Sequence, residues 1–192
     1  AAVDFLARGS GYNVWLTQGD AVLALDTGTV GQVIKLDVVG ANASAPASGE
    51  NALQSKSNYL TGSQDQWRTN VDNYGSVRYQ GIYDGIDLRY YGAQRQLEYD
   101  FQVGPGADAS AIRLSFEGAQ IVSVSASGDL VLTLDDAGNS VSFKAPVSYQ
   151  DSASGHTTVA SHYVLHEDGT VGFDVGPYDH TRSLTIDPVL SY

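Results

Sequence analysis

The chain has 192 residues, enough for one domain with a substantial hydrophobic core or for two small ones. It contains no Cys, which excludes disulfides and a thiol nucleophile, and 22 acidic residues against 10 basic ones give it a net charge of −12. A charge of this sign argues against nucleic acid and anionic membranes as partners, because both select basic faces. No apolar run approaches the ~20 residues of a membrane-spanning helix. Since the chain starts at Ala1 and has no Met, we expect a processed or excised piece of a longer protein.

Strands separated by turn residues are predicted in the N-terminal part of the chain. The predicted strands cover residues 3–6, 12–16, 21–25 and 33–39. Residues 41–56 begin with a run of small residues and are predicted to form a loop or linker. Ser63 stands where it would cap a single helical turn over residues 63–67.

From Gly104 onward the pattern is typical of a β-meander. After one short helical turn at residues 108–111, strands are predicted at 112–116, 121–124, 130–134, 141–144, 147–150, 159–165, 171–175 and 184–186. No segment carries a sustained apolar pattern at the i, i+3, i+4 spacing of a helix. We therefore predict an all-β fold: an antiparallel β-sandwich-like module built of hairpins and meanders.

The whole chain, residues 1–192, is expected to form one module. Residues 19–26 resemble residues 128–135, and a Gly-containing turn and a Val-led strand follow each of them. Two related lobes would produce this likeness, the first made of residues 1–40 and 57–104 and the second of residues 105–192. Chance would produce it too, because any hairpin uses these residue types. Both explanations stay open.

The clearest strand pairing lies in residues 86–103. Apolar and polar residues alternate on both sides of a short Gly-containing link, which is typical of a β-hairpin. A turn centred on residues 93–94 sets the register. It places Tyr90 opposite Leu97, Leu88 opposite Tyr99, Arg89 opposite Glu98 and Asp87 opposite Asp100. The residues expected on the buried face are Leu88, Tyr90, Leu97, Tyr99 and Phe101.

The polar face of this hairpin is the first candidate ligand-binding site. It carries Asp87, Arg89, Tyr91, Glu98 and Asp100. In the simplest interpretation this is a solvated face with cross-strand ion pairs. Like charges directly opposed are destabilising. A cation, a nearby Arg such as Arg78, or a slipped register would remove the repulsion between the carboxylates of Asp87 and Asp100. The two carboxylates would also suit glycoside hydrolysis.

Calcium is the metal for which the sequence offers oxygen ligands. Asp135 and Asp136 lie in a turn, and Asp87 and Asp100 add further carboxylates. None of them has the spacing of an EF-hand loop, and Asp is also an ordinary turn former. We therefore expect no obligatory cofactor, with calcium as the open alternative. The sequence has no G-x-S-x-G motif and no Walker lysine, and we expect no enzymatic activity.

Aromatic residues are the remaining candidates for ligand contact. Trp67, Tyr74, Tyr79, Tyr83 and Tyr91 would form a sugar-stacking platform if they were exposed in one row, and would belong to the core if they were buried. Trp67, which lies between Gln66 and Arg68 in a polar segment, is the one expected near the surface and is included among the candidate ligand-binding residues.

Several long blocks of the sequence resemble one family. They read FLARGSGYNVWLT, SNYLTGSQDQWRTNV, YGSVRYQGIYDGIDLRYYG, QLEYDFQVGPGADASAIRLSFEG and RSLTIDPVLSY. The chain is similar, over essentially its whole length, to the N-terminal domain found ahead of β-propeller-type (SBBP) repeats in large bacterial cell-surface and secreted proteins. The resemblance implies an exported multidomain parent with β-repeat domains downstream as partners, and it brings no catalytic residues.

We therefore expect a non-catalytic N-terminal module of a bacterial protein that is secreted or displayed on the cell surface. One role is that of a structural cap, because arrays of β repeats need ends that leave no sheet edge open. Adhesion or binding of a surface glycan or protein is the other role. The alternative class is a carbohydrate-active module that binds glycans or hydrolyses them with paired carboxylates.

Overall fold

The computed structural model describes residues 3–9, 12–26, 31–93, 96–152, 155–188 and 190–191. Within these ranges the chain forms antiparallel strands and two short 3-10 turns, η1 (Gln64–Gln66) and η2 (Ala109–Ala111), with no α-helix. This confirms the predicted all-β, sandwich-like fold. Ser63 precedes η1 as its capping residue, as the sequence indicated. No helix in the described part is long and apolar enough to span a membrane.

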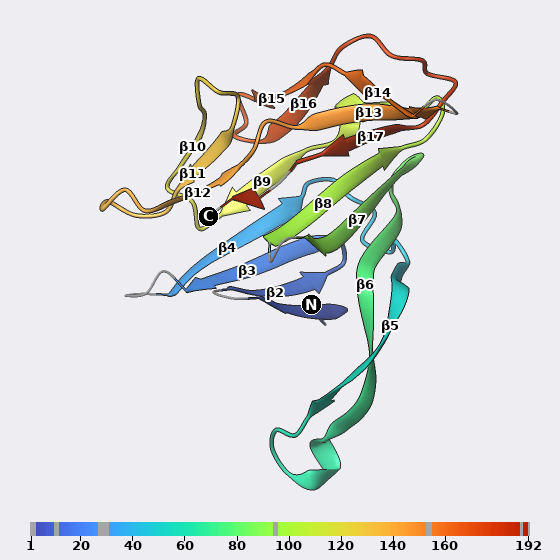
Figure 1. Cartoon of the computed structure of the whole chain (residues 1–192). Coiled ribbons are helices and arrows are strands. Elements are labelled where there is room, and N and C mark those ends of the chain that lie inside the picture. Colours follow the sequence, from blue (N-terminus) through green and yellow to red (C-terminus); the bar gives the residue numbers. More distant parts are fainter. Residues whose placement is uncertain are drawn as a thin grey trace.

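Two seven-stranded sheets form most of the molecule (Figure 1). Sheet A runs in the order β1 (Phe5–Gly9), β2 (Tyr12–Thr17), β3 (Asp20–Asp26), β4 (Gly31–Val38), β9 (Leu114–Glu117), β16 (Val171–Val175) and β15 (Ser161–Leu165). Sheet B runs in the order β14 (Gly155–Val159), β13 (Val147–Ser152), β17 (Leu184–Asp187), β8 (Gln96–Val103), β7 (Ile86–Ala93), β6 (Arg68–Tyr83) and β5 (Ala47–Tyr59). A small third sheet contains β10 (Ile121–Val124), β11 (Leu130–Thr133), β12 (Ser140–Phe143) and β18 (Leu190–Ser191).

The two large sheets fit a fold of two lobes. Their division does not fall at residue 105, however, because each sheet takes strands from both sides of it. The predicted strand at 159–165 is likewise divided at Ala160 between β14, which lies in sheet B, and β15, which lies in sheet A. Sheet membership is decided by which strands meet in space, so local alternation did not indicate it.

One hydrophobic core joins the three sheets. The ring centroids of Phe101 in β8 and Phe173 in β16 are 6.0 Å apart, which links sheet B to sheet A. Phe143 in the small sheet lies 5.8 Å from Tyr99 in sheet B and 5.5 Å from Phe116 in sheet A. Edge and tilted ring contacts of this kind are favourable in themselves and also bury a large apolar area. The sheets are therefore held as one packed unit.

β7 and β8 form the predicted hairpin, but two residues out of the predicted register. Arg89 lies opposite Asp100 rather than Glu98, and Asp87 lies opposite Gln102 rather than Asp100. A shift of two residues keeps every side chain on its own face, so the alternation of apolar residues fits both registers equally well. The predicted buried face is confirmed, since Leu88, Tyr90, Leu97, Tyr99 and Phe101 are all buried.

The hairpin of β5 and β6 extends well beyond the body of the molecule (Figure 1). We call its projecting part, residues 51–75, the arm; nearly all its side chains are exposed. The prediction of a loop over residues 41–56 was therefore wrong from Ala47 onward, where β5 begins. The reason is that β5 owes its order to backbone pairing with β6 rather than to a buried apolar face. Of the predicted loop, only residues 41–46 lie outside a strand.

Candidate functional site

Asp87 on the outer face of sheet B is held in place by protein groups. Its Oδ2 accepts a hydrogen bond from Arg78 Nε at 3.1 Å, and Arg78 Nη2 also donates to it. Its Oδ1 accepts from the backbone N–H of Gly81 at 2.7 Å. The hydrogen bond with Asp87 is the main cause of the raised pKa of Arg78. Asp87 is thus the ion-pair partner of Arg78. The sequence had suggested Arg78 as one of the groups that could neutralise the charge of Asp87.

Arg89, which lies on β7 with Asp87, joins this network. Its Nε lies 3.5 Å from a carboxylate oxygen of Glu50 in β5, and its Nη2 donates to the hydroxyl of Ser76 at 3.1 Å. Glu50 also lies 3.7 Å from Arg78. Two guanidinium groups therefore share the Glu50 carboxylate. Partly exposed ion pairs of this kind contribute little to stability. They do hold the side chain of Arg89 toward β6 and β5, where Ser76 and Glu50 lie.

Asp100 is the most buried carboxyl of this face, at 6% exposure. The hydroxyl of Tyr91 donates to its Oδ1 at 2.9 Å. Burial raises the pKa of Asp100 to about 6, and the Tyr91 hydrogen bond opposes that rise. The predicted pairing of Asp100 with Asp87 was wrong, because Asp100 lies opposite Arg89. A carboxyl group of another strand adjoins Asp100 instead.

That carboxyl belongs to Asp187 at the end of β17. β17 pairs with β8 at Ile186 and Phe101, which places Asp187 beside Asp100. Burial and then the charge of Glu98 raise the pKa of Asp187, while a hydrogen bond with Asp100 lowers it. Two carboxyl groups can hydrogen-bond only if one of them is protonated, so the pair holds a proton more readily than isolated Asp does. Sequence reasoning missed Asp187, because only the order of strands in sheet B brings it here.

The acidic turn at Asp135 and Asp136 is built by its own hydrogen bonds. The Asp135 carboxylate accepts from the side chain of Asn139 at 2.7 Å and from the backbone N–H groups of Ala137 and Asn139, both at 3.0 Å. These bonds, with that of the Asn139 side chain first, lower the pKa of Asp135. They are the bonds of a turn-forming Asp. In the described part of the chain, no group of three or more His, Cys, Asp or Glu is placed to hold a metal ion.

The aromatic residues considered for a sugar platform are dispersed. Tyr79 is buried against Tyr90, with perpendicular rings 6.2 Å apart. Trp67 lies at the surface as expected, 39% exposed, but it follows η1 in the connection between β5 and β6 and does not belong to the β7–β8 hairpin. Tyr74 is exposed, and its ring meets Phe5 edge-on at an interplanar angle of 82°. These residues do not form one coplanar row.

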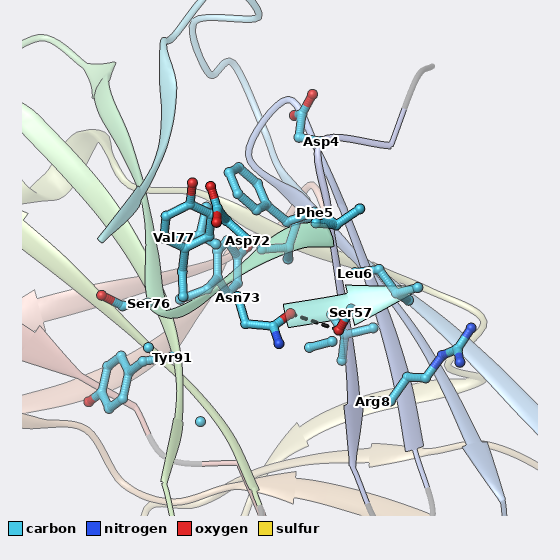
Figure 2. Close-up of a pocket in the computed structure, with 18 of the residues that line it drawn as sticks. Asp4, Phe5, Leu6, Arg8, Ser57, Asp72, Asn73, Ser76, Val77 and Tyr91 are labelled. Carbon is cyan, nitrogen blue, oxygen red and sulfur yellow. Dashed lines mark hydrogen bonds between the residues drawn. The ribbon is translucent and has the colours of Figure 1, made fainter. Parts of the chain in front are cut away.

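A cleft of about 900 Å³ lies between β1 and the arm (Figure 2). Residues 3–8 form one wall, and residues 71–77 with Leu53 and residues 57–59 form the other; Tyr91, Gly92 and Leu97 also line it. The two walls are far apart in sequence, so no local residue pattern could predict the cleft. Of the predicted ligand-binding residues, only Tyr91 lines it.

Apolar side chains remain exposed inside this cleft. Val3, Leu53, Val71 and Tyr74 all line it and are between 37% and 51% exposed. Polar groups lie among them. Ser57 Oγ donates to Asn73 Oδ1 at 2.8 Å across the arm, and the guanidinium of Arg8 lies 5.7 Å from the centre of the Tyr59 ring (Figure 2 shows Ser57, Asn73 and Arg8). Apolar surface with a few placed polar groups is typical of a ligand site.

The comparison with known families gives one match. The family described as "Domain of unknown function (DUF7948)" matches residues 1–189. The chain belongs to this family. No curated protein and no solved structure matched the chain. The matched residues include both walls of the cleft and every strand described above except β18.

Proposed function

We propose that this domain is a non-catalytic binding module of an exported, multidomain bacterial protein, and that the cleft between β1 and the arm is its ligand site. The carrying observation is that four large apolar side chains stay exposed in one hollow of a domain whose other large apolar side chains mostly share one packed core. Grouped exposed apolar surface of this kind marks sites of interaction. The exported parent and its downstream β repeats follow from the sequence resemblance.

The carboxyl groups of sheet B support a binding role over hydrolysis. Asp87 is tied to Arg78 and Gly81, and Asp100 is tied to Tyr91 and Asp187. None of these carboxylates lines the cleft. A glycosidase needs two carboxyl groups free to flank the substrate bond. Both carboxyl groups of the cleft walls, those of Asp4 and Asp72, are already engaged, and Asp72 forms an ion pair with Lys56. Asp4 accepts hydrogen bonds from the Gln18 backbone at 2.8 Å and the Tyr79 hydroxyl at 3.2 Å.

A fluorescent probe with apolar rings and an anionic group, 8-anilinonaphthalene-1-sulfonate, tests whether the cleft accepts a ligand. We expect the folded protein to bind the dye with a blue-shifted emission, because the cleft offers apolar walls beside Arg8. Val71→Ser and Leu53→Ser should weaken that binding. The matched control is Ile121→Ser, which removes an exposed apolar side chain from β10, outside the cleft. Equal binding by all three variants and the wild type would contradict the proposal.

A further inference from the structure

The cleft lies over the inner face of β2, where alternate residues Tyr12, Val14 and Leu16 line it, and it also reaches the edges of two strands. In a strand, successive side chains point to opposite faces, so a hollow over one face is lined by every second residue. Here residues 3–8 are all in the lining, and so are residues 71–77. Lining by consecutive residues shows that the cleft extends to the edge of β1 on one side and to the edge of β6 on the other.

Both of these edges are unpaired where they meet the cleft. β1 is the terminal strand of sheet A and pairs only with β2 among the described residues. β6 pairs with β7 from Tyr83 back to Ser76, so its residues 71–75 have β5 on one side and the cleft on the other. Strand edges of this kind carry backbone N–H and C=O groups that favour pairing with a further strand.

The charged residues that line the cleft indicate which kind of ligand it would bind. Asp72 forms an ion pair with Lys56, and Asp4 already accepts two hydrogen bonds. Arg8 is the third charged residue of the lining, and it has no carboxylate within ion-pair distance among the described residues. Its guanidinium lies against Tyr59, an arrangement that leaves N–H groups available for a carboxylate. In a chain of net charge −12, a cation without an acidic partner at the cleft indicates an anionic group on the ligand.

We propose that the cleft receives an extended polypeptide segment, which adds as a strand along the open edge of β1 and places a carboxylate on Arg8. Backbone hydrogen bonds supply affinity in this mode, and alternate side chains of the added strand supply specificity. Leu53, Val71 and Tyr74 offer the apolar contacts for those side chains. This inference rests on the proposed function of the cleft and names its ligand class. Glycans lack the amide pattern that a strand edge recognises.

A display library of random 12-residue peptides, panned on the intact domain, tests the inference, with a glycan array run in parallel. Peptides that bind are then synthesised, and each backbone amide is N-methylated in turn. We expect N-methylation to abolish binding at every second position, because alternate amides of an added strand point to β1. Amide hydrogen exchange should slow at alternate residues of β1 on binding. Since N-methylation changes the peptide and leaves the protein intact, a folding defect cannot imitate this result.

Arg8→Ala should weaken peptide binding roughly tenfold to a hundredfold, as expected for a lost charge-assisted hydrogen bond. The control is Arg68→Ala, which removes an exposed Arg of the arm outside the cleft lining and should leave binding unchanged. Failure to select any peptide overturns the inference, as does a uniform response to N-methylation or unaltered exchange in β1. If glycans bind and displace the dye while peptides do not, the proposed ligand class is wrong, but the proposal that the cleft is a ligand site is supported. If the dye does not bind in the cleft, the proposed function itself fails.

Discussion

Replacing Asp100 by Asn removes an ionisable group from a site where burial opposes its charge. The pKa of Asp100 is raised from 3.8 to about 6, chiefly by burial. The folded protein therefore binds the Asp100 proton at a higher pH than the unfolded chain does. Below about pH 3.8 the group is protonated in both states, and its ionisation costs nothing. As the pH rises from 3.8 through 6, the unfolded chain loses the proton first, and the free energy of unfolding falls.

The magnitude follows from the difference between the two pKa values. About 2 pH units, at about 1.36 kcal/mol for each, amount to about 3 kcal/mol of lost stability above pH 6. Asn has the shape of the protonated side chain and can accept the Tyr91 hydrogen bond. We therefore expect Asp100→Asn to raise the free energy of unfolding by up to about 3 kcal/mol at pH 8. At pH 3.5 it should have little effect. The value is an upper bound, because Asn loses the attraction to Arg89.

Urea denaturation of wild type and variant at the two pH values measures this, with the fluorescence of Trp15 and Trp67 as the signal. Asp136→Asn, on an exposed turn, is the control for the loss of one negative charge from an acidic protein. A variant that is less stable than wild type at pH 8, and unchanged at pH 3.5, would refute the reasoning. It would mean that Asp100 is ionised and stabilised by Arg89, rather than strained by burial.

Three further predictions concern the core, the arm and calcium. Phe101→Ala should lower the free energy of unfolding by about 3–5 kcal/mol in the same assay, because the ring is fully buried against Tyr99 and Phe173; a loss below about 1 kcal/mol would contradict its place in the core. Replacing residues 54–72 of the arm by a two-residue Asn-Gly turn should leave the thermal unfolding transition nearly unchanged, since these residues lie outside the core cluster. Insoluble expression of that variant would show that the arm supports folding. Calcium should raise the melting temperature no more than magnesium does at equal ionic strength; a saturating, calcium-specific rise that Asp135→Asn removes would instead identify a site.

The sequence by itself determined that the fold is all-β and which side of the central hairpin faces the core. Leu88, Tyr99 and Phe101 are buried as their alternation with polar residues predicts, because a pleated strand sends successive side chains to opposite faces. The same period of two could not distinguish registers that differ by two residues. Arg89 was therefore predicted opposite Glu98 and is found opposite Asp100. The arm escaped detection for a related reason: its strands are exposed on both faces, so they carry no apolar alternation.

Only the tertiary structure decided which distant strands lie side by side. Asp187 adjoins Asp100 because β17 pairs with β8, and the cleft exists because β1 ends sheet A where the arm leaves sheet B. Backbone hydrogen bonds between strands are the same for every sequence, so local residue patterns do not encode the order of strands in a sheet. That order is set by the simultaneous packing of all three sheets around one core. The carboxyl pair and the cleft, which are made by neighbours far apart in the chain, follow from that packing.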